Sequence, residues 1–338
     1  MGPASRCFKD QLCGLAVMLL TVLPPIAGAQ TCQTASDMDA TVRTAIANAA
    51  DRYFGMAVRG DSLSLRQNSI PSLASDFTGV QNVIKEHQQD LAGAQANIKS
   101  SFLLNAEDAV PNQRAEFYCG VFNRNGQTAN SAAFYLENLA PGKYAAVLLD
   151  ANSPKGRTMF SEILQQAGNE WKLGGLYIKS AQITGHDSDW FLNQARQYKA
   201  KGQAHNAWFY YLEARSLMSP LPFMSTLATD KLYDESQSLQ PTDLPAGGKT
   251  ATLASPTNSY KLTAVFPEAV GNDLDLIVRY ESANVSNANV AYQDNVNVMK
   301  ALVARFPEVR EAFAAVVARA VDTSGRDYGT LLAMKDIK

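Results

Sequence analysis

The side chains best suited to proton transfer in this sequence are its three histidines, His87, His186 and His205. Imidazole can gain or lose a proton near neutral pH, which makes it a frequent general base. His87 stands at helical spacing from Ile84 and Leu91, so we expect it on the inward face of a helix. Two interpretations stay open for it: a general base or ligand contact, and a core histidine held by one hydrogen bond. We therefore assign no catalytic residue.

His186 lies in the segment GHDSD at 185–189, which offers oxygen and nitrogen atoms to a metal ion. The same oxygen atoms suit the start of a helix, where they accept hydrogen bonds from free backbone amides. The helix cap explains the segment better, and we predict no metal site. His205 follows a helix–helix turn and is expected to be exposed. Because the sequence contains no glycine-rich phosphate loop, no Gly-x-Ser-x-Gly elbow and no His-Glu-x-x-His pattern, we predict no cofactor.

The first 29 residues predict a cleavable secretory signal peptide. Arg6 and Lys9 precede an uncharged apolar run at 12–23, and small residues at 27–29 form a cleavage site. The run is shorter than the roughly 20 residues that cross a membrane, although an N-terminal anchor is the alternative. We expect cleavage after Ala29 and a secreted or periplasmic mature protein with no membrane span.

Cleavage would leave two of the four cysteines, Cys32 and Cys119. In an oxidising compartment two remaining cysteines can pair. They are therefore either a disulfide that ties the mature N-terminus to a strand of the first sheet, or two unpaired thiols.

Hydrophobic periodicity predicts helices first and strands afterwards. Apolar residues recur every three to four positions over 37–58, 62–67 and 80–91, as in amphipathic helices. Alternating apolar residues then predict antiparallel strands near 97–106, 114–123, 131–137, 143–150, 157–167 and 170–181. Helices on one face of a curved antiparallel sheet make an α+β domain over 35–181.

The second half of the chain predicts further units. A helical hairpin with linker helices covers 187–238 and turns at 201–203, and a linker rich in Pro, Gly, Ser and Thr covers 239–258. Residues 259–338 predict a small second α+β domain with strands at 259–266 and 273–281, a helix at 289–305, and a hairpin of 313–321 and 327–334. The stretch 309–320 also fits helical spacing.

Residues 40–92 resemble the NTF2-like superfamily, whose α+β cone is also called cystatin-like. The helix that ends in RYFGMAVRGD at 52–61 and the segment Asp76-Phe77-Thr78-Gly79 before the third helix carry the resemblance. The strand meander extends it over 35–181. The superfamily contains isomerases, dehydratases, cyclases and non-catalytic binding or dimerisation modules, so the fold alone does not define function.

The resemblance implies a ligand pocket inside the cone and a homodimer through the sheet. The ligand-binding residues would be Tyr53, Phe77, His87, Tyr135 and Trp171. Related enzymes combine an inward acid or histidine with a tyrosine donor, but Asp51 falls on the solvent side of its helix. No matching acid is identified, and aromatic residues on a sheet also serve as core.

Residues 190–220 resemble a single tetratricopeptide-like helical hairpin, on the spacing of Ala195, Tyr198, Gly202, Ala207, Tyr211, Ala214 and Pro220. A solenoid takes about three such repeats. The hairpin therefore either packs on a neighbouring domain or forms a peptide-binding groove. Residues 240–338 resemble no family that we identify.

The formal net charge of −2 gives no electrostatic reason to expect nucleic acid as a partner. We predict a secreted or periplasmic, non-enzymatic binding or assembly protein whose partner is an unidentified protein or small molecule. One alternative is an NTF2-like small-molecule enzyme of the isomerase, dehydratase or cyclase type that uses a pocket His and Tyr. The second is a peptide-binding adaptor that acts through the helical hairpin.

Overall fold

A computed structural model describes residues 30–338 except 110–112, 125, 130 and 257. The predicted signal peptide at 1–29 lies outside the described residues. Within the described part of the chain, no helix is both long enough and apolar enough to span a membrane. The described chain is an α+β protein with three larger sheets and a small hairpin, β4 (Phe122–Asn123) and β5 (Gly126–Gln127).

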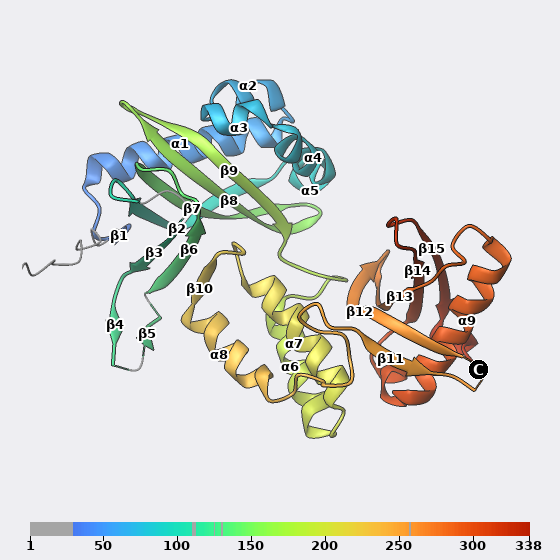
Figure 1. Ribbon diagram of the computed structural model, residues 1–338. Helices are drawn as coiled ribbons and strands as arrows, with labels where there is room; N and C mark the ends of the chain where they lie inside the picture. Colours follow the sequence, from blue (N-terminus) through green and yellow to red (C-terminus); the bar gives the residue numbers. More distant parts are fainter. Residues whose placement is uncertain (1–29, 110–112, 125, 130, 257) are drawn as a thin grey trace, which may run out of the picture.

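The N-terminal half is built on a five-stranded antiparallel sheet with helices on one face (Figure 1). Its strand order is β1 (Thr31–Thr34), β2 (Gln95–Asn105), β7 (Lys143–Ser153), β8 (Gly156–Ala167) and β9 (Glu170–Ser180). The helices are α1 (Ala40–Val58), α2 (Ser62–Gln67), α3 (Pro71–Ser75), α4 (Thr78–Glu86) and α5 (Gln88–Leu91).

The longest of these helices, α1, forms because its apolar residues share one face and its first turn is capped. The Asp39 carboxylate accepts hydrogen bonds from the backbone amides of Thr41 and Val42, which would otherwise have no partner in the helix. Gly60 follows the helix at a φ of +68°, a conformation that glycine adopts without strain. The buried face packs on the sheet through Ile46, Ala49, Ala50, Tyr53, Phe54 and Ala57.

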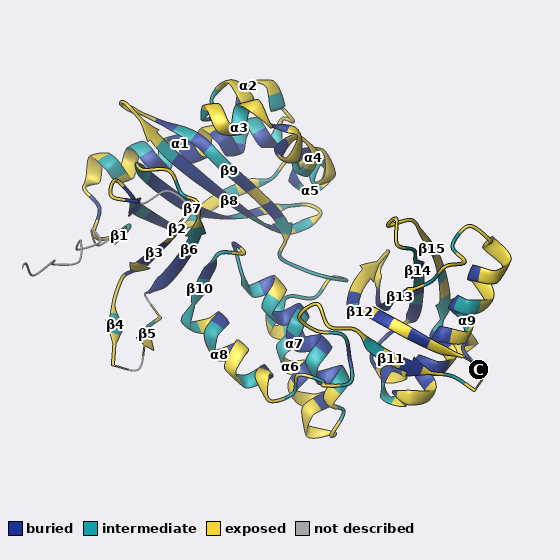
Figure 2. Ribbon diagram, viewed as in Figure 1, coloured by how far each residue is buried: buried dark blue, intermediate teal, exposed yellow. Residues whose placement is uncertain are grey.

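A second, three-stranded sheet covers the other face of the first. Its order is β10 (Met224–Thr226), β6 (Ala132–Glu137) and β3 (Arg114–Cys119). Phe117 and Phe134 of this sheet share a hydrophobic core with Phe102, Leu148 and Ile163 of the first. Strand β7 is therefore buried on both faces, and Figure 2 shows the resulting continuous buried stretch.

A disulfide joins the two N-terminal sheets. Cys32 lies on β1, and Cys119 is the last residue of β3, 87 positions along the chain. Of the two alternatives that the sequence leaves open, the structure contains the bonded one, but the expectation that Cys119 lies in the first sheet is wrong, because β3 pairs with β6 in the second sheet. The bond connects an edge strand of the first sheet with an edge strand of the second.

The helices α6 (Ser188–Ala200), α7 (Ala204–Met218) and α8 (Leu227–Gln237) lie between the two β-regions of the molecule (Figure 1). The C-terminal sheet has the order β11 (Ala251–Ala254), β12 (Ser259–Val270), β13 (Asp273–Glu281), β14 (Ala315–Val321) and β15 (Asp327–Ala333). Helix α9 (Ala288–Arg305) and a 3₁₀ turn, η1 (Pro307–Glu311), connect β13 to β14, and these two strands pair in parallel.

The α6–α7 hairpin and the C-terminal sheet share one hydrophobic core. Phe209 and Tyr210 of α7 belong to the same cluster as Leu276 of β13 and Val316 of β14. The Tyr210 hydroxyl also donates a hydrogen bond to the carbonyl of Ala312 at 2.8 Å. The hairpin therefore packs as part of the C-terminal unit.

Three local features differ from the sequence prediction. The helix expected over 80–91 is interrupted at His87, which ends α4 and precedes α5. The linker expected over 239–258 contains β11, because Ala251–Ala254 pair with β12. The ambiguous stretch 309–320 forms a 3₁₀ turn and then β14, whose pairing with two neighbouring strands outweighs its helical spacing.

We expect reduction of the Cys32–Cys119 disulfide to destabilise the protein by about 2–4 kcal/mol. A cross-link over 87 residues restricts the unfolded chain far more than the folded one. Thermal unfolding with and without reductant measures the effect. The Cys32→Ser, Cys119→Ser double variant should unfold at the temperature of the reduced wild type and be insensitive to reductant. Equal melting temperatures for oxidised and reduced wild type would contradict the expectation.

Candidate functional site

The interior of the predicted cone is filled by side chains. Tyr53, Phe77 and Trp171 are each less than 10% exposed and belong to the core between the helices and the first sheet. The Tyr53 hydroxyl donates to the Trp171 carbonyl at 2.8 Å and accepts from Arg52 at 3.0 Å. Burial raises the pKa of this hydroxyl. These three aromatic residues therefore hold the helices on the sheet.

The other two predicted pocket residues lie elsewhere. His87 is half-buried where α4 meets α5, and its Nδ1 lies 3.1 Å from the Asp90 carboxylate on the same short segment. Tyr135 lies on β6 of the second sheet, where its ring packs under the Arg114 guanidinium at 4.3 Å. The structure thus brings Tyr53, Phe77 and Trp171 together in the core between the helices and the first sheet. Tyr135 belongs to the second sheet.

Glu162 is a buried acid near Tyr53 and was not among the site residues predicted from the sequence. It lies on β8 opposite Val147 of β7 and Leu176 of β9. The residue is 0% exposed, and neither carboxyl oxygen has a hydrogen-bond partner among the described residues. Burial raises its pKa well above the usual range, and the nearby Asp51 carboxylate adds to the rise. The neutral acid is therefore the favoured form in the fold.

A cavity of about 540 Å³ lies between β9 and the C-terminal end of α7. Its apolar lining comes from Val83 of α4, Leu212 of α7, and Pro220 and Pro222. The strand contributes four consecutive residues, Leu176, Tyr177, Ile178 and Lys179. The volume lies within the range of pockets that bind small molecules. We call this feature the β9 cleft.

Two cations lie in the β9 cleft without a carboxylate partner among the described residues. The Lys179 ammonium donates to the backbone carbonyl of Ser216, and burial lowers the pKa of Lys179 to about 8. The Arg215 guanidinium lies over the Tyr233 ring, 4.7 Å from its centroid. A partly desolvated ammonium gains from a negative neighbour, so the cleft is electrostatically suited to an anion.

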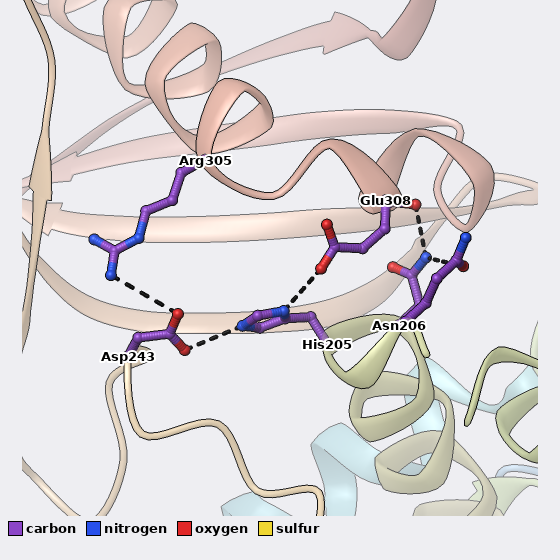
Figure 3. Close-up of polar contacts among 6 residues, drawn as sticks. His205, Asn206, Asp243, Arg305 and Glu308 are labelled. Carbon is purple, nitrogen blue, oxygen red and sulfur yellow. Dashed lines mark hydrogen bonds and ion pairs between the residues drawn. The ribbon is translucent and has the colours of Figure 1, made fainter. Parts of the chain in front are cut away.

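His205 forms the centre of a polar cluster that joins three segments (Figure 3). Its Nδ1 lies 2.8 Å from Glu308 Oε1 and its Nε2 lies 3.0 Å from Asp243 Oδ1. Arg305 approaches the other oxygen of Asp243 at 3.8 Å, and the Asn206 amide donates to the Glu308 carbonyl at 2.6 Å.

The expectation that His205 is exposed is wrong, because its side chain is 19% exposed and bonded on both sides. Through it, the start of α7 is tied to the loop before β11 and to the 3₁₀ turn after α9. The cluster is therefore a structural joint of the C-terminal unit.

His186 lies in a second, smaller cavity of about 320 Å³ and stacks on Trp190, with the ring centroids 3.7 Å apart. The neighbouring Asp187 caps α6 by accepting from the Trp190 amide at 3.0 Å. Among the described residues, no group of three His, Cys, Asp or Glu side chains is arranged to hold a metal ion.

No family model, no curated protein and no solved structure matches this chain.

We expect Glu162→Gln to remove a pH-dependent loss of stability. A buried acid whose pKa is higher in the folded than in the unfolded chain makes the fold less stable as pH rises through the unfolded value. The variant should therefore gain stability over wild type from about pH 4.5 to pH 7.5, as measured by denaturant unfolding. Glu170→Gln, at the exposed start of β9, is the matched control. Parallel pH profiles for wild type and Glu162→Gln would refute the assignment.

We expect His205→Gln to destabilise the protein by about 1.5–3 kcal/mol, because the glutamine amide carries both donor hydrogens on one nitrogen and cannot span Glu308 and Asp243 as the two ring nitrogens do. His87→Gln is the control, since it removes one bond to the half-exposed Asp90 and should cost less than about 1 kcal/mol. Thermal unfolding of both variants gives the comparison. Equal losses of stability in the two variants would show that the His205 cluster does not hold the three segments together.

Proposed function

We propose that this protein is an extracytoplasmic binding protein that holds an amphipathic anionic ligand in the β9 cleft. The observation that carries the proposal is the pairing of an apolar cavity with two cations that lack a carboxylate partner among the described residues. An apolar wall supplies affinity for hydrocarbon, and a few well-placed charges orient the ligand.

The chemistry of the cleft favours a ligand with an apolar body and a negative head. Val83, Leu212 and Pro222 offer hydrocarbon surface on either side of β9. Lys179 and Arg215 offer positive charge at the same cavity. A neutral or cationic ligand of equal length would leave the Lys179 ammonium partly desolvated and without a counter-charge, which is costly.

Enzymatic activity inside the cone is the other candidate, and Glu162 next to the Tyr53 core is the observation in its favour. A substrate would have to reach a carboxyl group that is 0% exposed. It would also have to displace apolar side chains packed between α1 and the sheet. The β9 cleft has no such barrier, so binding there is the better-supported function.

The proposed location rests on two features. The first 29 residues have the pattern of a signal peptide. The second feature is the Cys32–Cys119 disulfide, because disulfides persist in oxidising compartments.

We expect dodecanoate to bind the wild-type protein in isothermal titration calorimetry at pH 7. Lys179→Met should weaken binding by about tenfold or more, because the anion loses one of the two cations that line the cleft. Lys172→Met, on the same strand but outside the cleft lining, is the matched control and should leave binding unchanged. Binding should also weaken as pH rises from 7 to 9.5, because Lys179, with a pKa of about 8, loses its charge over this interval. This pH dependence should be absent in Lys179→Met.

Dodecyltrimethylammonium, which has the same chain length and the opposite charge, should bind more weakly than dodecanoate. Equal affinity for the two amphiphiles, or equal dodecanoate affinity in Lys179→Met and Lys172→Met, would overturn the proposal.

A further inference from the structure

Strand β9 has an unpaired edge. It is the last strand in the order β1-β2-β7-β8-β9, so β8 occupies only one of its two sides. On the other side, residues 68–70 reach it at one point, where Leu173 bonds to Asn68 at 3.0 Å and to Ile70 at 2.9 Å. Beyond that point, residues 174–180 form no backbone hydrogen bond on this side with any described residue. Their outward N–H and C=O groups are available to a partner.

The cleft lies along this edge rather than on one face of the strand. Successive side chains of a strand point to opposite faces. Leu176 and Ile178 belong to the core on the helix side, whereas Tyr177 contacts Phe223 on the other side, with ring centroids 5.6 Å apart. A cavity lined by all four residues from Leu176 to Lys179 must therefore run beside the backbone.

We propose that the natural ligand of the β9 cleft is an extended peptide that adds a strand to this free edge and places an acidic group against Lys179 and Arg215. The inference rests on the proposed binding function and specifies its ligand. Such strand addition draws affinity from main-chain hydrogen bonds and selectivity from the flanking side-chain surfaces.

The exposed backbone is what favours a peptide over a hydrocarbon. A fatty chain such as dodecanoate gains from the apolar lining and Lys179, but it removes water from the outward amides and carbonyls of β9 and offers them no hydrogen bond. A peptide in the same place would satisfy these groups and should therefore bind more tightly. Paired strands rise by about the same 3.3 Å per residue. A peptide segment of about four residues would therefore span the four residues of β9 that line the cleft.

A second copy of this chain fits the edge less well than an acidic peptide. Pairing β9 with its own copy would bring Lys179 and Arg215 of both copies to one interface. Like charges across a paired edge are unfavourable, and lysine on an edge strand is a usual obstacle to self-pairing.

The test uses the mature chain, 30–338, immobilised and exposed to an equimolar library of acetylated hexapeptides with free C-terminal carboxylates. Peptides retained by wild type and not by Lys179→Met are synthesised singly. Each is then made in two versions, one N-methylated on the odd-numbered amides and one on the even-numbered amides. A paired strand directs alternate amides to its neighbour, so one version should lose affinity by about tenfold or more while the other keeps it. Amides within 174–180 should also exchange more slowly with deuterium in the complex.

The outcomes separate this inference from the proposed function. Dodecanoate binding that depends on Lys179, with no peptide retained, would uphold the binding function and overturn strand addition. A retained peptide that tolerates both methylation patterns would also overturn it. Sedimentation that shows a stable dimer disrupted by Lys179→Glu would assign the edge to a second copy. Binding of neither peptide nor dodecanoate would refute both proposals.

Discussion

The constraint on which this molecule depends is that the inner strands of its first sheet are covered on both faces. Phe160 and Leu164 of β8 point into the core under α1, while Ile163 between them points into the core under the second sheet. The Cys32–Cys119 bond fixes the two sheets to each other at the opposite side from β9. Strand β7 is buried on both faces and offers neither of them to a ligand, whereas Tyr177 of β9 is exposed beside the free edge. Since β1 is the edge tied by the disulfide, β9 is the edge at which we propose binding.

Two desolvated ionisable side chains in the N-terminal half, Glu162 and Lys179, lower the stability of the ligand-free fold. They differ in whether a ligand can reach them. Glu162 is enclosed by apolar side chains, so its burial stabilises nothing and shifts the carboxyl group to its neutral form. Lys179 is also desolvated, but it lines a cavity that an anion can enter. A partly desolvated charge that a ligand can reach favours binding, because the ligand supplies the missing counter-charge. For this reason we propose the binding site at the edge of the sheet rather than in the core around Glu162.

The elements of the fold were largely predictable, whereas the site was not. The apolar run of β7, the apolar pattern of β8 and the three-to-four spacing of α1 are local signals, and the observed strands and helix lie close to the predicted ranges. The alternation Phe160, Glu162, Leu164 was also present in the sequence and could have placed the acid on the inward face of β8. The cleft had no such signal. It arises where β9 meets Leu212, Arg215 and Pro222, and this contact depends on how the C-terminal unit packs.

That packing gives the C-terminal unit a defined part in the proposed function. Helix α7 contributes one wall of the β9 cleft through Leu212 and Arg215, while its other side is buried through Phe209 and Tyr210 against the C-terminal sheet. The His205 cluster holds the start of the same helix. A binding wall that is already fixed loses little conformational entropy when a ligand enters, so affinity is gained by preorganisation. In the proposed function, the C-terminal sheet therefore acts indirectly, by fixing the helix α7 that lines the β9 cleft opposite the strand.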